Sequence, residues 1–97
     1  MTLIQGRLIK GRTLASLYLD VGMKTESDLA LCRLFGKNLA TIRKKKGWSQ
    51  ERLANESGLA RSYVGDVERG IRNIALVNIC KIADTLEVDV LELMRFR

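Results

Sequence analysis

The sequence contains no histidine and no proline, and only two cysteines among its 97 residues. Histidine is the commonest general base at neutral pH and the commonest zinc ligand, so its absence removes the usual partner of a serine or cysteine nucleophile. We therefore expect a protein that is not an enzyme, with no catalytic residues, no metal site and no cofactor. Cys32 and Cys80 are far apart and lack Cys-x-x-Cys spacing, which favours reduced packing residues over a disulfide or metal ligands.

Long apolar runs are also absent. The longest runs are far shorter than the roughly 20 residues that a membrane span needs, and the amino terminus has no uninterrupted apolar core followed by a small-residue cleavage site. These absences predict a cytoplasmic protein without a membrane partner. A hydrophobic fraction of 46% is typical of a folded chain, and the length suits one compact domain.

The net charge of +6 is concentrated in the middle of the chain. Residues 1–32 hold four basic and three acidic groups, residues 33–72 hold ten and four, and residues 73–97 hold three and four. Such a positive block can serve solubility alone, but it is also typical of a polyanion-binding surface. Charge alone leaves nucleic-acid binding and a solvated face open.

Apolar residues recur at helical spacing from Leu34 onward. A first amphipathic helix is predicted from Leu34 to Lys46, where Gly47 provides the stop signal. Its apolar stripe consists of Leu34, Phe35, Leu39 and Ile42. Ser49 suits the cap of a second helix, which turns Leu53 and Ala54 inward and ends at Gly58.

Three further helices are expected after Gly58. The third spans residues 60–69 with Val64 and Val67 inward, although Ala60 is a poor cap and Gly65 costs up to about 1 kcal/mol relative to alanine. A short last helix starts near Asp89 and offers more apolar surface than one subunit usually covers, which suggests a partner subunit. The apolar stripe of the fourth helix comprises Leu76, Ile79, Ala83 and Leu86, widened by Cys80 and Ile82.

The segment before Leu34 is harder to interpret. We treat residues 1–33 as an amino-terminal extension and residues 34–97 as the folded domain. Thr13 is a candidate cap for a helix, while the pairs at residues 3–4 and 8–9, beside Gly6 and Gly11, resemble short extended pieces. A helix, an arm and a partly disordered segment all remain open.

The spacing across the second and third helices is the most specific motif. When Gln50 is counted as the first residue, Ala54 is the fifth, Gly58 the ninth, Val64 the fifteenth and Val67 the eighteenth. A small residue at Ala54 lets two helices approach, and glycine allows the left-handed conformation of a tight turn. The two valines hold the third helix against the first two. This pattern predicts a helix-turn-helix.

Three strings carry a resemblance to a known family: Trp48 to Ala54, Gly58-Leu59, and Ser62 to Gly70. The chain resembles the phage-repressor-like, xenobiotic-response-element type of helix-turn-helix regulators, and the last string, continued through Ile74, is most similar to restriction-modification controller proteins. This resemblance implies an all-α, five-helix repressor-like bundle. It also implies a homodimer that binds double-stranded operator DNA, with the third helix in the major groove.

The resemblance also implies roles for particular residues. The base-reading positions are Arg61, Ser62, Gly65 and Asp66; the phosphate-binding positions are Gln50, Tyr63, Arg69, Arg72 and Asn73; Arg43 and Glu68 form a structural ion pair. The forked guanidinium of Arg61 suits a guanine edge, with a phosphate contact as the alternative. Gly65 allows close approach, and Asp66 accepts from a cytosine or holds a neighbouring side chain.

The leading hypothesis is a sequence-specific transcriptional regulator of a pseudo-palindromic operator, with the controller of a restriction-modification operon as the narrower form. The alternative is an antitoxin that binds a toxin, with residues 1–33 as the toxin-binding part, and represses its own operon. Ala60 and Ala75 depart from the family pattern, because a hydroxyl residue usually caps the helices that follow them.

Overall fold

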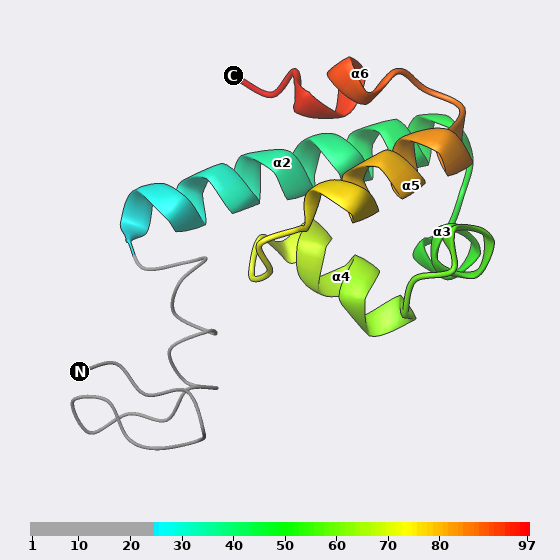
Figure 1. Ribbon diagram of the computed structural model, residues 1–97, viewed down its shortest axis with the longest axis horizontal. Coiled ribbons are helices and arrows are strands. Elements are labelled where there is room, and N and C mark those ends of the chain that lie inside the picture. The colour runs from blue at the N-terminus through cyan, green and yellow to red at the C-terminus, as the bar shows by residue number, and fades with distance from the viewer. Residues whose placement is uncertain (1–24) are drawn as a thin grey trace.

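The computed structural model describes residues 25–97, which form five helices and no strand (Figure 1). Long α2 runs beside α6 and crosses the carboxy-terminal part of α4, and the short α3 and α4 lie on the side opposite α6. None of the described helices is long and apolar enough to cross a membrane. The helices are α2 (Glu26–Lys45), α3 (Gln50–Ser57), α4 (Arg61–Arg69), α5 (Leu76–Leu86) and α6 (Val90–Met94).

The start of α2 differs from the sequence prediction. The helix begins at Glu26 rather than near Leu34, so the expected boundary between residues 33 and 34 falls inside it. Thr25 accepts a hydrogen bond from the Asp28 amide at 3.1 Å and donates its own amide to Asp28 at 3.3 Å. This reciprocal capping box starts the helix with aspartate where glutamate or glutamine is usual. Thr13 and the three alternatives left open for its segment lie outside the described residues.

The hydrophobic core is built from all five helices. Several side chains at its centre are fully buried, and a partly buried shell surrounds them. Leu34 and Leu76, both predicted to face inward, are instead 41% and 73% exposed because they lie beside the buried stripes of their helices. The core residues are Phe35, Leu39, Leu53, Ala54, Val64, Val67, Ile79, Ile82, Ala83, Leu86 and Leu93.

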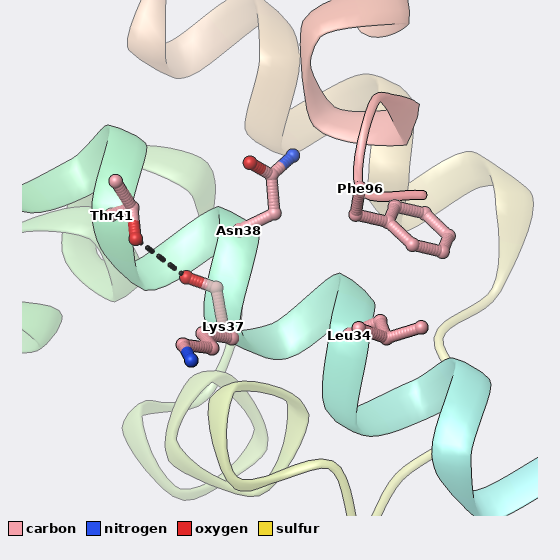
Figure 2. A pocket seen from close by; sticks show the side chains of 5 residues that line it. All are labelled: Leu34, Lys37, Asn38, Thr41 and Phe96. Atoms are coloured by element: carbon pink, nitrogen blue, oxygen red, sulfur yellow. Dashed lines mark hydrogen bonds between the residues drawn. The ribbon is translucent and has the colours of Figure 1, made fainter.

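An asparagine of α2 fixes the end of α6. The Asn38 amide nitrogen donates to the carbonyls of Glu92 at 2.8 Å and Leu93 at 2.9 Å, which are among the last carbonyl oxygens of the helix. Figure 2 shows Asn38 reaching from α2 toward α6, with Phe96 beside it. The Phe96 ring packs edge-on against Phe35, with ring centroids 6.0 Å apart. These contacts close the carboxy-terminal end of the chain over α2.

Both cysteines are free, and they differ in burial. Cys32 is half-buried on α2, and burial is the main cause that raises the pKa of its thiol. Cys80 is exposed on α5, so the prediction that it packs within the stripe of that helix is wrong. The buried stripe of α5 runs through Ile79, Ile82 and Ala83 instead.

Candidate DNA-binding surface

The turn between α3 and α4 has the geometry that the spacing predicted. Gly58 adopts φ 78°, a left-handed conformation that a side chain would strain, and its amide donates to the Ala54 carbonyl at 3.0 Å. Ala54 is 2% exposed where the two helices meet. Val64 and Val67 anchor α4 in the core, which leaves the opposite face of α4 to solvent.

The predicted base-reading residues lie along this outer side of α4. Arg61 and Ser62 are exposed in its first turn, while the backbone of Gly65 is covered. A methyl group added at Gly65 comes 3.1 Å from Nη1 of Arg61, 3.7 Å from Nη1 of Arg69 and 3.8 Å from Oε1 of Gln50. Both arginine side chains therefore extend over the bare backbone at Gly65.

A buried ion pair joins α2 to α4, between the two residues that the sequence analysis paired. Arg43 donates to Glu68 from Nε at 2.7 Å and from Nη2 at 2.9 Å, and the two side chains are 8% and 5% exposed. The hydrogen bond to Glu68 is the main cause that raises the pKa of Arg43, so the guanidinium stays charged. Its Nη1 also donates to the Trp48 carbonyl at 2.7 Å, which fixes the segment before α3.

Gln50, predicted to bind phosphate, is tied to the same carboxylate. Its side-chain nitrogen donates to Glu68 at 2.7 Å, so α3 and α4 share this group. Ser49 caps α3 by accepting from the Arg52 amide at 3.0 Å. The first amides of a helix have no partner within it and favour an anion, and Gln50, predicted to bind phosphate, is the first residue of α3.

Tyr63 links α4 to the start of α5. Its hydroxyl oxygen accepts from the Asn78 side chain at 2.9 Å and from the Ala75 amide at 3.4 Å. Ala75 has no side-chain cap of its own, so the tyrosine supplies the acceptor that the sequence lacked there. The predicted phosphate contact of Tyr63 therefore has to use the hydroxyl proton, which these two bonds leave available.

The remaining predicted phosphate contacts lie at the end of α4 and in the segment that follows it. The side chains of Arg69 and Arg72 are 64% and 49% exposed, and Asn73 is exposed beside them. Both arginines pair with Asp66, whose side chain is 24% exposed. Within residues 25–97, the sequence analysis missed the partners that hold this surface, above all Asn78 and the Trp48 carbonyl, because neither carries a local sequence signal.

The similarity to known proteins covers the helix-turn-helix and the helices around it. Residues 39–93 match the helix-turn-helix family. Control protein C.BamHI from Bacillus amyloliquefaciens is 47% identical over 64 residues, which cover 65% of this chain and 79% of that protein. The crystal structure of the restriction-modification controller protein C.AhdI from Aeromonas hydrophila superimposes with a TM-score of 0.65 at 55% identity, covering 66% of this chain and 97% of that one.

A third relative was solved on DNA. It is the tetramer of the restriction-modification controller protein C.Esp1396I in complex with its natural 35 base-pair operator. That chain superimposes with a TM-score of 0.58 at 30% identity, covering 67% of this chain and 96% of its own length.

Proposed function

Because the chain belongs to the helix-turn-helix family, we propose that it is a DNA-binding transcription regulator that reads a pseudo-palindromic operator as a homodimer. The observation that carries the proposal is the outward face of α4, which presents Arg61, Ser62 and Arg69 on a frame fixed by the buried Arg43–Glu68 pair. The similarity to C.BamHI and C.AhdI supports the narrower proposal, a controller of a restriction-modification operon.

The proposed docking places α4 in the major groove. Arg61, at the amino-terminal end of α4, pairs with both acceptors of a guanine, and Ser62 lies beside it. Gln50 and the first amides of α3 bind one phosphate, and Arg69, Arg72, Asn73 and the Tyr63 hydroxyl bind others. The phosphate contacts set the register of the helix on the duplex, and the base contacts supply the specificity.

Selection of bound sequences from a random duplex pool, at near-physiological salt, tests the function. We expect an enriched inverted repeat. Arg61→Ala should lose about 1–3 kcal/mol of discrimination at one base pair of each half-site, which is the value of a bidentate arginine–guanine contact. Titration of the selected duplex and of its single-base variants, with both proteins, measures this loss.

Lys45→Ala is the matched control for Arg61→Ala. Lys45 is exposed at the far end of α2, so its loss removes one positive charge without touching α4. We expect Lys45→Ala to weaken operator and random duplex alike. Equal affinity of the wild type for operator and random duplex would contradict the proposal. If about six phosphates are neutralised, the logarithm of the binding constant should fall with the logarithm of salt at a slope near −5.

The second copy of the proposed dimer is expected to cover an apolar surface on α5 and α6, two helices that pack together. Leu76 and Val77 of α5 are 73% and 64% exposed, and Leu91 and Met94 of α6 are 62% and 46% exposed. Large apolar side chains gathered on adjacent elements are typical of a protein interface. A two-fold dimer also matches the symmetry of a pseudo-palindrome.

Leu76→Glu should dissociate this dimer. A carboxylate forced into an apolar interface loses its hydration without gaining a partner, so the dimer dissociation constant should rise about a hundredfold or more. Sedimentation equilibrium at micromolar concentration measures the mass, and operator titration should show parallel weakening. Leu34→Glu, the same change at a 41% exposed leucine of α2, should stay dimeric. A monomeric wild type would disprove the dimer.

The antitoxin alternative gains no support from the relatives reported above, whose names describe controller proteins. Most of its expected toxin-binding part, residues 1–33, lies outside the described residues. Copurification with a small protein encoded beside this gene is the result that would favour it.

A further inference from the structure

Asp66 is the acidic side chain that α4 turns toward the proposed DNA surface. The other acidic residue of the helix, Glu68, faces inward and is 5% exposed, against 24% for Asp66. A carboxylate on a surface that meets phosphates weakens the attraction between protein and DNA. The position of Asp66 on this surface therefore indicates that its negative charge has a role that compensates for the weaker attraction.

Asp66 contacts two of the arginines proposed to bind phosphate, one through each carboxylate oxygen. Oδ1 accepts a hydrogen bond from Nη2 of Arg69, one turn further along α4. Oδ2 lies 3.5 Å from Nη2 of Arg72, which belongs to the segment after the helix. One carboxylate thus contacts an arginine of the helix and an arginine beyond its end.

Arg72, which contacts Asp66, also contacts Tyr63, the residue that links α4 to the start of α5. The Arg72 guanidinium carbon lies 5.1 Å from the centroid of the Tyr63 ring, and the face of an aromatic ring attracts a cation at this distance. The Tyr63 hydroxyl in turn accepts from Asn78 and from the Ala75 amide at the start of α5. Arg72 therefore lies between Asp66 and Tyr63, and its other N–H groups, like those of Arg69, remain for phosphate.

We propose that Asp66 is a positioning residue, which holds Arg69 and Arg72 for the operator backbone and lowers the affinity for other DNA. The inference rests on the proposed function. Random duplex attracts the protein by charge, and Asp66 offsets one of the two positive charges that it contacts. The operator complex loses the same attraction. It recovers this loss because its phosphate contacts require the two guanidinium groups in particular positions, and Asp66 holds them there before binding. Asp66 thereby raises the ratio of specific to non-specific binding.

Asp66→Asn tests this inference, with titration of operator and random duplex over a range of salt. One additional uncompensated positive charge should tighten random-duplex binding about fivefold at 0.15 M salt and steepen the salt slope by about one. Operator affinity should change less, so the specificity ratio should fall, and the selected operator sequence should stay the same. Asp66→Glu, which keeps a carboxylate within reach of both arginines, should keep the wild-type ratio.

Glu56→Gln is the charge-matched control. Glu56 also pairs with an arginine, Arg52 at 2.8 Å, but on the surface of α3, where both side chains are about half exposed. It should leave the specificity ratio unchanged. The inference is overturned if Asp66→Asn behaves like Glu56→Gln, or if it tightens both duplexes equally, since charge alone then explains the effect. An altered base preference would overturn it too, by making Asp66 a base-reading residue.

The two proposals fail in different ways. If the wild type discriminates its operator while Asp66→Asn matches it in slope and ratio, the inference about Asp66 is wrong and the proposed function stands. If the wild type binds operator and random duplex equally, both are wrong.

Discussion

Glu68→Ala is expected to lower the free energy of unfolding by about 3–5 kcal/mol, a large share of the stability of a domain of this size. The Glu68 carboxylate is 5% exposed and accepts two hydrogen bonds from Arg43 and one from Gln50. Its removal leaves the Arg43 guanidinium buried, with the Trp48 carbonyl as the acceptor that remains to it. An uncompensated buried charge causes the loss, and urea unfolding followed by circular dichroism measures it.

A second glutamate–arginine pair supplies the control. Glu56 and Arg52 lie 2.8 Å apart on α3, with side chains 49% and 52% exposed. Because water screens this pair, Glu56→Ala should cost only about 0.3–0.5 kcal/mol. Replacing both Arg43 and Glu68 with methionine should recover much of the lost stability, since no buried charge remains. Equal losses for Glu68→Ala and Glu56→Ala would show that burial of the first pair has no energetic consequence.

The sequence predicted the helix ends well where a local signal exists. Ser49, Gly58 and Asp89 cap or end helices as expected, because each acts on backbone groups a few residues away. The start of α2 was missed because its cap uses Asp28, outside the usual capping-box pattern. Leu76 was misplaced for a different reason: helical spacing alone does not reveal which side of a wide apolar stripe packs into the core and which side is exposed.

Less of the candidate site than of the fold could be predicted from the sequence. The Arg43–Glu68 pair was expected from a family resemblance, because no local sequence pattern predicts a contact between residues 25 positions apart. The Tyr63 hydroxyl joins Asn78 from 15 positions away, and the missing cap at Ala75 was the only sign that some acceptor was needed there. For Asp66 the two alternatives were a base and a neighbouring side chain. The structure shows Asp66 in contact with Arg69 and Arg72, which corresponds to the second alternative.

Gly36→Ala is the change for which sequence and structure predict opposite signs. In an exposed helix, alanine in place of glycine gains about 1 kcal/mol of stability. At Gly36, however, α2 crosses the end of α4, and an added methyl group would lie 2.3 Å from the Val67 carbonyl oxygen and 2.6 Å from that of Glu68. Both atoms are backbone, so relief requires the two helices to separate, and we expect a loss of about 3 kcal/mol or more.

Gly65→Ala, in the middle of α4, is the comparison variant. It separates the effect of close helix–helix contact on stability from the effect of helix propensity. A methyl group there meets only the flexible ends of Arg61, Arg69 and Gln50, 3.1–3.8 Å away, so the gain in propensity should leave stability unchanged or slightly higher. Thermal unfolding of both variants decides the matter. If Gly36→Ala is as stable as Gly65→Ala, the close crossing of α2 and α4 does not limit the fold. If it unfolds about ten degrees or more lower, the close crossing of α2 and α4 depends on the absence of a side chain at Gly36.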